Sequence, residues 1–131
     1  MLLNNKFTGV NKIMSNSFTE YAVPDVVYID VDGTLIINDR INHDLVSWAR
    51  QQSQEGKEII VWSARGKSNA ENAVDRCEIG DIVSHALSKP GYIVDDLGNQ
   101  WTEYMNIIHV DHISKPPKKD NSQQNMRISL I

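Results

Sequence analysis

Residues 26–35, with the sequence VVYIDVDGTL, carry the strongest pattern in this chain. The apolar residues 26–29 are typical of a buried strand, and Gly33 is a residue type that ends strands. Asp30 and Asp32 are therefore expected where the strand leaves its sheet. In an open parallel sheet, ligands bind at that edge. The stretch predicts a functional site at a strand end, and the alternative is an acidic turn exposed to solvent.

The composition suits a single domain with one core, because the chain has 131 residues and 40% of them are hydrophobic. The net charge of −4 predicts no general affinity for nucleic acid, although a local basic groove is compatible with it. Cys77 is the single cysteine, so no internal disulfide can form and a cytoplasmic location is expected. No apolar run is long enough to span a bilayer, and we expect no membrane partner.

Three segments of different composition follow one another along the chain. Residues 1–22 are polar and predict an N-terminal leader, in which either Met1 or Met14 starts the protein. Residues 23–113 contain the candidate strands and helices and predict the folded domain. Residues 114–131 contain prolines, lysines and a Ser/Gln/Asn run, which predict a flexible C-terminal tail.

Candidate strands and helices alternate between residues 26 and 110. We expect strands over 26–31, 58–62, 92–94 and 106–110, and a weaker extended segment over 82–87. One helix is expected to begin in the stretch NHD at 42–44 and to end at Gly56. The other is expected to begin at Ser68 or Asn69 and to reach Cys77. This alternation predicts the α/β class, with a mostly parallel sheet and covering helices.

Reactive side chains follow the ends of four of these segments. They are Asp30, Asp32, Ser63, Lys89, Asp95 and Asp96. Because the carboxyl ends of parallel strands meet at one edge of a sheet, we expect these groups to converge. Carboxylates gathered there repel each other unless a cation lies between them, and Mg²⁺ prefers oxygen ligands. Hydroxyl and ammonium groups suit phosphate oxygens, and a carboxylate can attack phosphorus.

On these motifs, the chain resembles the haloacid dehalogenase (HAD) superfamily. Four motifs of that superfamily occur in order: DVDGTL at 30–35, an apolar strand ending at Ser63, Lys89 before Pro90, and IVDD at 93–96. The resemblance covers roughly residues 24 to 112 and implies a three-layer Rossmann-like sheet with flanking helices. Neither 35–43 nor 64–88 is long enough for a cap domain. The chain is therefore similar to the small capless HAD phosphatases linked to capsule biosynthesis or encoded by phages.

The resemblance implies separate roles for the carboxylates. Asp30 is the expected nucleophile and a metal ligand. Asp32 is the expected general acid and base, with its backbone carbonyl on the metal. Dehalogenases lack this acid and base, so Asp32 favours phosphoryl transfer. Asp95 and Asp96 are expected to complete the Mg²⁺ site.

The resemblance also implies how the phosphoryl group is held. Four residues are expected to bind it: Thr34, Ser63, Ala64 and Lys89. Arg65 and Lys67 are candidate substrate contacts, or else part of a solvated loop. They are also the alternatives to Lys89 as the cation that binds phosphate.

The link between Lys89 and Asp95 departs from the pattern of the superfamily. Only five residues separate the two, which leaves no room for a helix. In the superfamily's strand order, the third strand lies roughly 14 Å from the fourth, at ~4.8 Å for each spacing. Residues 89–91 span at most about 10 Å. We therefore expect residues 82–87 to cross the sheet and not to form a regular edge strand.

These patterns predict a Mg²⁺-dependent phosphomonoester hydrolase that acts through an aspartyl-phosphate on Asp30. The candidate substrates are a sugar phosphate, a nucleotide, a phosphorylated nucleic-acid end or a phosphoprotein. An open site without a cap suits large substrates or a homo-oligomer that closes the site. The alternative is a catalytically silent phosphate-binding or regulatory module. Finally, we expect Trp48, Trp62 and Trp101 to be packing residues and Cys77 to be buried.

Overall fold

The structure is a computed structural model, and it describes residues 22–113. The leader predicted over 1–22 and the tail predicted over 114–131 lie outside the described residues, except for residue 22. The described chain divides into two compact units. Residues 25–93 and 107–113 belong to one unit, residues 22–24 and Val94–Asn106 belong to the other, and each is described by itself.

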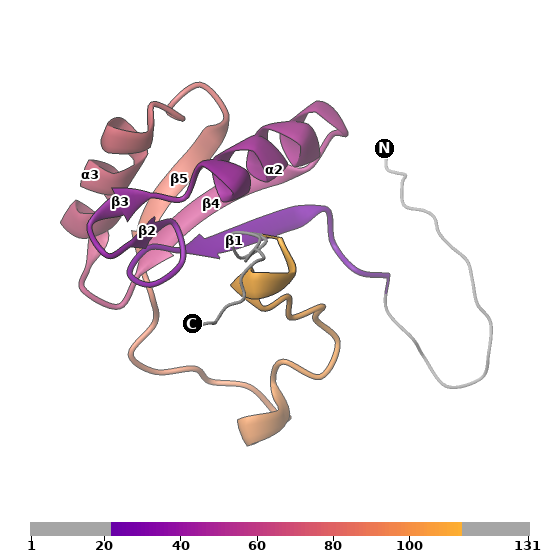
Figure 1. The fold of residues 1–131 in the computed structure, drawn as a ribbon. Coiled ribbons are helices and arrows are strands. Elements are labelled where there is room, and N and C mark those ends of the chain that lie inside the picture. Colours follow the sequence, from indigo (N-terminus) through magenta and orange to yellow (C-terminus); the bar gives the residue numbers. More distant parts are fainter. Residues whose placement is uncertain (1–21, 114–131) are drawn as a thin grey trace, which may run out of the picture. The chain divides into compact units, whose positions relative to one another are not determined.

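The larger unit is built on a parallel sheet of three strands, in the order β1-β4-β5 (Figure 1). The strands are β1 (Val26–Asp30), β4 (Glu58–Ser63) and β5 (Val83–Ser88). β1 pairs with β4 in regular register, with Tyr28 opposite Ile60 and Asp30 opposite Trp62. This arrangement confirms the predicted α/β class and its parallel sheet.

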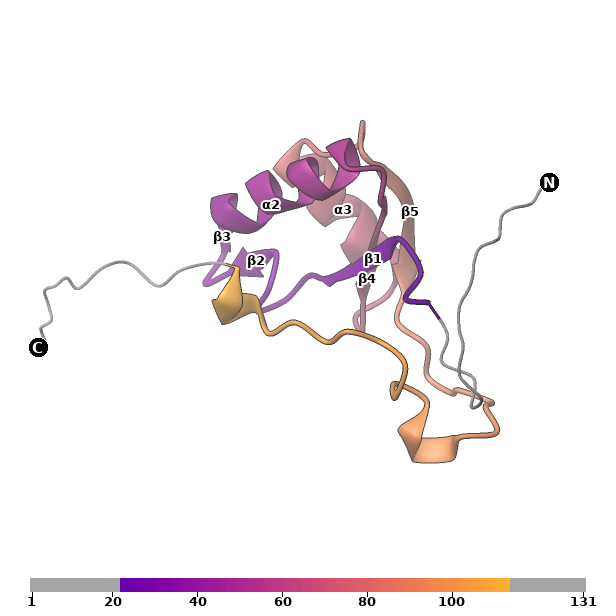
Figure 2. The ribbon, with the colours of Figure 1, turned by 90° about the vertical axis from the view of Figure 1, so that its right-hand side faces the viewer.

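Two helices connect these strands, and both cover the same face of the sheet (Figure 2). They are α2 (His43–Gln54), between β1 and β4, and α3 (Lys67–Cys77), between β4 and β5. Both crossovers step the same way along the sheet, and right-handed connections therefore put both helices on one side. The second helical layer that the three-layer fold requires is not present among residues 22–113.

The ends of both helices follow from local chemistry. The side chain of Asn42 accepts a hydrogen bond from the backbone N–H of Leu45 and caps α2, and Gly56 follows the last turn with φ of 99°. Both predicted ends of α2 are confirmed. α3 begins at Lys67, one residue before the predicted Ser68, and ends at Cys77 as expected.

The core lies between the sheet and the two helices. Fully buried Leu35, Ile59 and Val61 contact small residues of the helices, among them Ala49 and Ala70. Trp48 packs against this cluster at its edge. Cys77 is buried, as predicted, and its burial raises the pKa of its thiol while the charge of Arg76 lowers it.

A short antiparallel hairpin follows the loop after β1. It consists of β2 (Ile36–Ile37) and β3 (Arg40–Ile41). The two turn residues, Asn38 and Asp39, have φ of 52° and 62°, values that suit the twist of a two-residue hairpin turn. The guanidinium of Arg76 on α3 lies 3.0 Å from the Asp39 carboxylate and also donates to the Asp39 carbonyl. The hairpin is thereby fastened to α3.

Residues 82–87 do not cross the sheet, and that prediction is wrong. Val83–Ser88 instead forms β5, which pairs in parallel with β4 at the edge of the sheet. A β-bulge interrupts the pairing, because Val83 lies opposite Ile59 while His85 lies opposite Ile60. The hydroxyl of the intervening Ser84 donates to the Glu58 carboxylate and lies 3.3 Å from the Ile59 carbonyl. The helical crossover through α3 brings β5 directly beside β4, which leaves no need for a crossing segment.

Two other predicted strands are absent from the described residues. Residues 92–94 have no strand partner, and Tyr92 and Val94 are 95% and 100% exposed. Three apolar residues after Pro90 and Gly91 are too few to bury a face without a neighbouring strand to pair with. Residues 106–110 are also not a strand, and the chain there leads into a 3₁₀ turn, η2 (Val110–His112). Another 3₁₀ turn, η1 (Gly98–Gln100), lies in the smaller unit.

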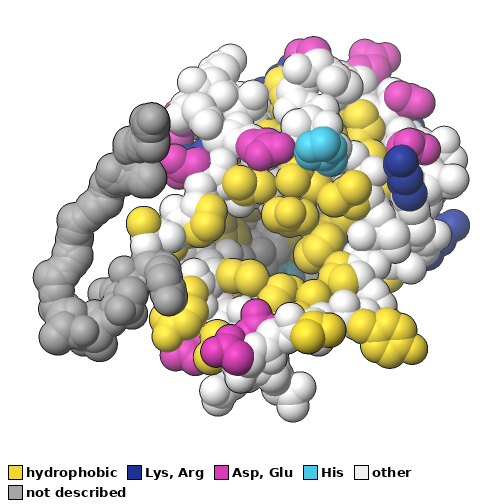
Figure 3. All heavy atoms as spheres, turned by 180° about the vertical axis from the view of Figure 1, so that it is seen from behind, with side chains coloured by type: hydrophobic (Ala, Val, Ile, Leu, Met, Phe, Trp, Pro, Cys, Tyr) yellow, Lys and Arg dark blue, Asp and Glu magenta, His cyan; other side chains and the backbone are white. Residues whose placement is uncertain are grey.

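The sheet face opposite the helices carries aromatic and aliphatic side chains, and we call it the helix-free face. By strand alternation it holds Tyr28, Ile60, Trp62 and Leu87. The Tyr28 and Trp62 rings have centroids 4.7 Å apart, and Tyr28 is 48% exposed. Trp62 is partly buried and lies outside the core cluster, contrary to the prediction. Figure 3 shows hydrophobic side chains gathered on one surface of the protein. Within residues 22–113, the structure has no helix with the length and apolar character of a membrane span.

Candidate active site

The loop 30–35 turns away from the sheet while its apolar residues stay in the core. Val31 and Leu35 are 2% and 0% exposed. The backbone N–H of Leu35 donates to the Asp30 carbonyl at 3.2 Å, and that of Gly33 donates to Ile36 at 2.8 Å. Gly33 has φ of 81°, a conformation that side chains disfavour. Two buried anchors and a tight turn thus hold both aspartates at the carboxyl end of β1.

Asp30 has a partner for each oxygen of its carboxylate. The hydroxyl of Thr34 donates to Oδ2 at 3.0 Å, and Nζ of Lys89 lies 3.1 Å from Oδ1. The Asp30 and Lys89 side chains are 31% and 35% exposed, so the pair is accessible from solvent. The structure therefore brings together the predicted nucleophile and two of the predicted phosphate-binding residues.

Lys89 reaches Asp30 from the strand at the opposite edge of the sheet. It follows β5, which is two strand spacings from β1, about 10 Å away. The Lys89 N–H donates to the Ser63 carbonyl at 2.9 Å, which holds its backbone at the end of β4. Its Nζ lies 5.8 Å from the ring centroid of Trp62, on the strand in between. The Trp62 ring thus supports the lysine side chain, a role that sequence reasoning missed.

Asp32 lies among different groups. Its Oδ1 is 3.0 Å from Nη1 of Arg65, and its Oδ2 accepts a hydrogen bond of 3.2 Å from the side chain of Asn69. Both side chains of the ion pair are largely exposed, at 48% for Asp32 and 69% for Arg65. Arg65 therefore contacts the predicted acid and base, whereas Lys89 contacts the predicted nucleophile.

Ser63 is almost fully buried, at 1% exposure, and its hydroxyl oxygen accepts two hydrogen bonds. The donors are the Arg65 backbone N–H at 3.0 Å and the side-chain amide of Asn69 at 2.8 Å. Asn69 joins Ser63 to Asp32, and sequence analysis treated it only as a candidate helix start. Its position three residues into α3, facing the end of β4, depends on how the helix packs and leaves no motif in the sequence.

Ala64 and Lys67 are the other predicted phosphate and substrate contacts, and they lie at the edge of the site. Ala64 is exposed in the turn between Ser63 and Arg65. Lys67 begins α3, and its ammonium lies 4.0 Å from the Glu71 carboxylate one turn along the helix. Lys89 and Arg65 thus contact the two carboxylates, whereas Lys67 lies beside Glu71 on its own helix.

Asp95 and Asp96 belong to the smaller unit. They follow no strand, and the Asp95 carboxylate accepts the backbone N–H of Leu97 at 2.8 Å, at the start of a turn. Among residues 22–113, no three His, Cys, Asp or Glu side chains form a group that could hold a metal ion. The predicted gathering of four strand ends is therefore reduced, in the larger unit, to the ends of β1, β4 and β5.

The residues present fit Mg²⁺ in part. Asp30 and Asp32 supply hard oxygen donors from one loop, and Mg²⁺ commonly binds through one or two carboxylates while keeping several waters. Their two negative charges already face Lys89 and Arg65. The two aspartates and the two cations balance each other, and a divalent metal that binds together with a phosphoryl dianion adds no net charge to them. The donor set thus suits Mg²⁺ bound jointly with phosphate better than Mg²⁺ bound alone.

Comparisons of this chain with protein-family models, with curated proteins and with solved structures find no match.

Proposed function

We propose that this protein is a Mg²⁺-dependent phosphomonoester hydrolase that forms an aspartyl-phosphate on Asp30. One observation carries the proposal: two carboxylates of the same loop lie in different surroundings. Lys89 and Thr34 flank Asp30, while Arg65 and Asn69 flank Asp32. A cation beside a nucleophile is where the oxygens of an incoming phosphoryl group are held. The resemblance of DVDGTL and the later motifs to the HAD superfamily supports the same chemistry.

The proposed reaction has two steps. An oxygen of Asp30 attacks phosphorus, the bond from phosphorus to the ester oxygen breaks, and protonated Asp32 gives its proton to the departing oxygen. Asp32 then takes a proton from water as the water oxygen attacks phosphorus. The bond from phosphorus to Asp30 breaks, and inorganic phosphate leaves. Lys89, Thr34 and the buried hydroxyl of Ser63 hold the phosphoryl oxygens in both steps.

Asp30 and Asp32 of the loop after β1 would hold the Mg²⁺. When bound, the ion would neutralise negative charge on the phosphoryl group. We expect chelation with EDTA to abolish phosphate release and added Mg²⁺ to restore it. Calorimetry should detect tighter Mg²⁺ binding with orthovanadate present than without it, since the two ligands together preserve the charge balance. Full activity in EDTA would contradict the metal proposal.

The decisive test is phosphate release from a panel of sugar phosphates, nucleotides and phosphorylated oligonucleotides. Asp30→Asn should lower kcat at least about 10³-fold, because an amide cannot act as the nucleophile. The matched control is Asp75→Asn, on the exposed side of α3, which should keep full activity. Failure of the wild type to hydrolyse any member, or full activity of Asp30→Asn, would overturn the proposal.

A phosphate-binding module without catalysis is the second candidate. The ion pair between Asp32 and Arg65 favours it, because the guanidinium lies 3.0 Å from a carboxylate oxygen that a general acid would turn toward the leaving group. Mg²⁺-dependent binding of beryllofluoride, combined with no turnover of the panel, would support this module. Turnover that depends on Asp32 would exclude it.

A further inference from the structure

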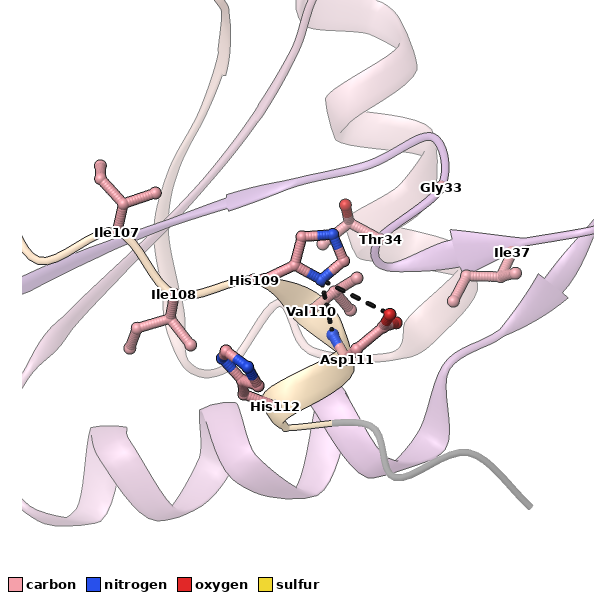
Figure 4. A pocket seen from close by; sticks show the side chains of 9 residues that line it. All are labelled: Gly33, Thr34, Ile37, Ile107, Ile108, His109, Val110, Asp111 and His112. Atoms are coloured by element: carbon pink, nitrogen blue, oxygen red, sulfur yellow. Dashed lines mark hydrogen bonds and ion pairs between the residues drawn. The ribbon is translucent and has the colours of Figure 1, made fainter. Parts of the chain in front are cut away.

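A pocket of about 590 Å³ opens beside the candidate active site (Figure 4). Its lining comes from two segments of the larger unit: residues Gly33, Thr34 and Ile37, and residues 107–112. Ile113 packs against the hydrophobic core and fastens the second segment. The volume lies within the range of about 300–1,000 Å³ that is usual for sites of small molecules.

Thr34 connects this pocket to the nucleophile. It lines the pocket, and its hydroxyl donates to Oδ2 of Asp30 at 3.0 Å. A phosphoryl group positioned by Asp30 and Lys89 is therefore one side chain away from the pocket. The remainder of a phosphomonoester has a route past Thr34 into this space.

The lining favours a flat apolar group and disfavours a second anion. Its walls include the side chains of Ile37, Ile107 and Ile108, and the latter two are 74% and 51% exposed. None of the nine lining residues is Lys or Arg. A bare sugar gains little from these aliphatic side chains, because it has no extended apolar surface to bury against them, whereas a nucleobase has a flat ring face.

The polar groups of the pocket suit the edge of a nucleobase. Nδ1 of His109 accepts the backbone N–H of Asp111 at 3.1 Å (Figure 4), so in the neutral ring the proton lies on Nε2 and can be donated. The Asp111 carboxylate is 78% exposed, its Oδ2 lies 3.7 Å from Nδ1 of His109, and its oxygens are acceptors for a ligand donor. One donor and one acceptor beside apolar walls match the mixed donor and acceptor edge of a base.

We propose that this pocket binds the base of a phosphorylated nucleoside, which makes a nucleotide the substrate class of the active site. The statement that the bound nucleotide is a substrate rests on the proposed phosphohydrolase function. The nucleotide is either a free mononucleotide or the terminal nucleotide of an oligonucleotide, because the two present the same base and phosphate.

The kinetic test compares purine nucleoside 5′-monophosphates with ribose 5-phosphate, which has the same phosphoryl group and sugar but no base. Wild-type kcat/KM should be at least about tenfold higher for the nucleotides, mainly through a lower KM. Ile108→Ser should bring this ratio to about twofold, and Ile93→Ser, an exposed isoleucine outside the pocket, should retain it. A 5′-phosphorylated oligonucleotide serves as the third substrate and distinguishes a terminal nucleotide from a free mononucleotide as the natural substrate. Equal kcat/KM for nucleotide and ribose 5-phosphate would overturn the inference.

A binding measurement keeps the pocket testable if no substrate is hydrolysed. Adenosine and guanosine, which lack the phosphate, are titrated into the full chain while the imidazole proton signals of His109 and His112 are followed by NMR. We expect at least one nucleoside to shift these signals in the wild type and to shift them less in Ile108→Ser. Unchanged signals with both nucleosides would overturn the pocket assignment. Absence of hydrolysis together with shifted signals would overturn only the proposed enzymatic function.

Discussion

At the scale of single residues, the site depends on side chains that link the motifs to one another. Asn69 donates to Ser63 and to Asp32 at 2.8 and 3.2 Å, and Trp62 lies below Lys89. Asn69 lies outside the motifs that identified the site in the sequence, and Trp62 was expected only to pack. Both act by positioning groups that would contact the phosphoryl group.

Removal of the Asn69 amide should therefore impair turnover more than binding. Asn69→Ala leaves Ser63 and Asp32 without their shared donor, so we expect kcat to fall about tenfold with a smaller change in KM. Steady-state kinetics with the best substrate of the panel measure both constants. Asn72→Ala, on the exposed side of the same helix, is the control and should match the wild type. An equal loss of kcat in the two variants would mean that Asn69 only stabilises the helix.

At the scale of elements, loops and turns are fastened to the helices by charged side chains. Arg50 on α2 donates to both carboxylate oxygens of Asp81, at 2.9 and 3.2 Å, and to the Glu78 carbonyl at the end of α3. These hydrogen bonds lower the pKa of Asp81, and the same pair raises the pKa of Arg50. The contact joins α2 to the turn that precedes β5.

The Arg50–Asp81 contact predicts how stability depends on pH. Because the pKa of Asp81 is lower in the folded protein, its contribution is present above the unfolded value of about 3.9 and is lost as the pH falls through the folded value. Asp81→Asn should lower Tm by about 2 °C at neutral pH, since exposed ion pairs contribute little. Thermal unfolding at a series of pH values should show this difference closing below about pH 4. A difference that persists in acid would mean that the pair is not its cause.

The hairpin β2–β3 makes a separate prediction about backbone conformation. Asn38 has φ of 52°, which an alanine side chain disfavours and glycine adopts freely. We expect Asn38→Ala to cost about 1 kcal/mol in the free energy of unfolding and Asn38→Gly to cost almost nothing. Urea unfolding of both variants measures the difference. If alanine is tolerated as well as glycine, the turn is not held in this conformation.

At the scale of the whole molecule, the charge bears on the substrate. The net charge of −4 provides little general attraction for a polyanion. We expect KM for a 5′-phosphorylated oligonucleotide to change less than about threefold between about 50 and about 200 mM salt. A steep rise of KM with salt would instead reveal a local groove of cations. Ribose 5-phosphate, measured at the same salt concentrations, controls for effects on the phosphoryl site.

The sequence predicted the parts of the fold that local chemistry determines. The buried runs of β1 and β4 and the caps at Asn42 and Gly56 follow from residue type alone. The crossing predicted for 82–87 was wrong because it assumed a fourth strand at 92–94 that the short link after Lys89 had to reach, and no such strand forms among the described residues. Residues 92–94 resemble a strand in composition but have no strand to pair with. The pocket beside Thr34 joins segments that end and begin 70 positions apart, at Ile37 and Ile107, a juxtaposition that no local pattern encodes.

The bulge at Ser84 determines which changes of length β5 can accept. Because Ser84 has no opposite residue on β4, the strand contains one residue more than the pairing requires. Deletion of Ser84 should leave a regular ladder and keep Lys89 next to the Ser63 carbonyl, so folding and activity should survive. An added residue between His85 and Ser88 needs a second bulge or moves the lysine about 3.3 Å along the strand, away from Asp30. Homologous chains, on this reasoning, can shorten this strand by one residue but cannot lengthen it without losing their lysine from the site.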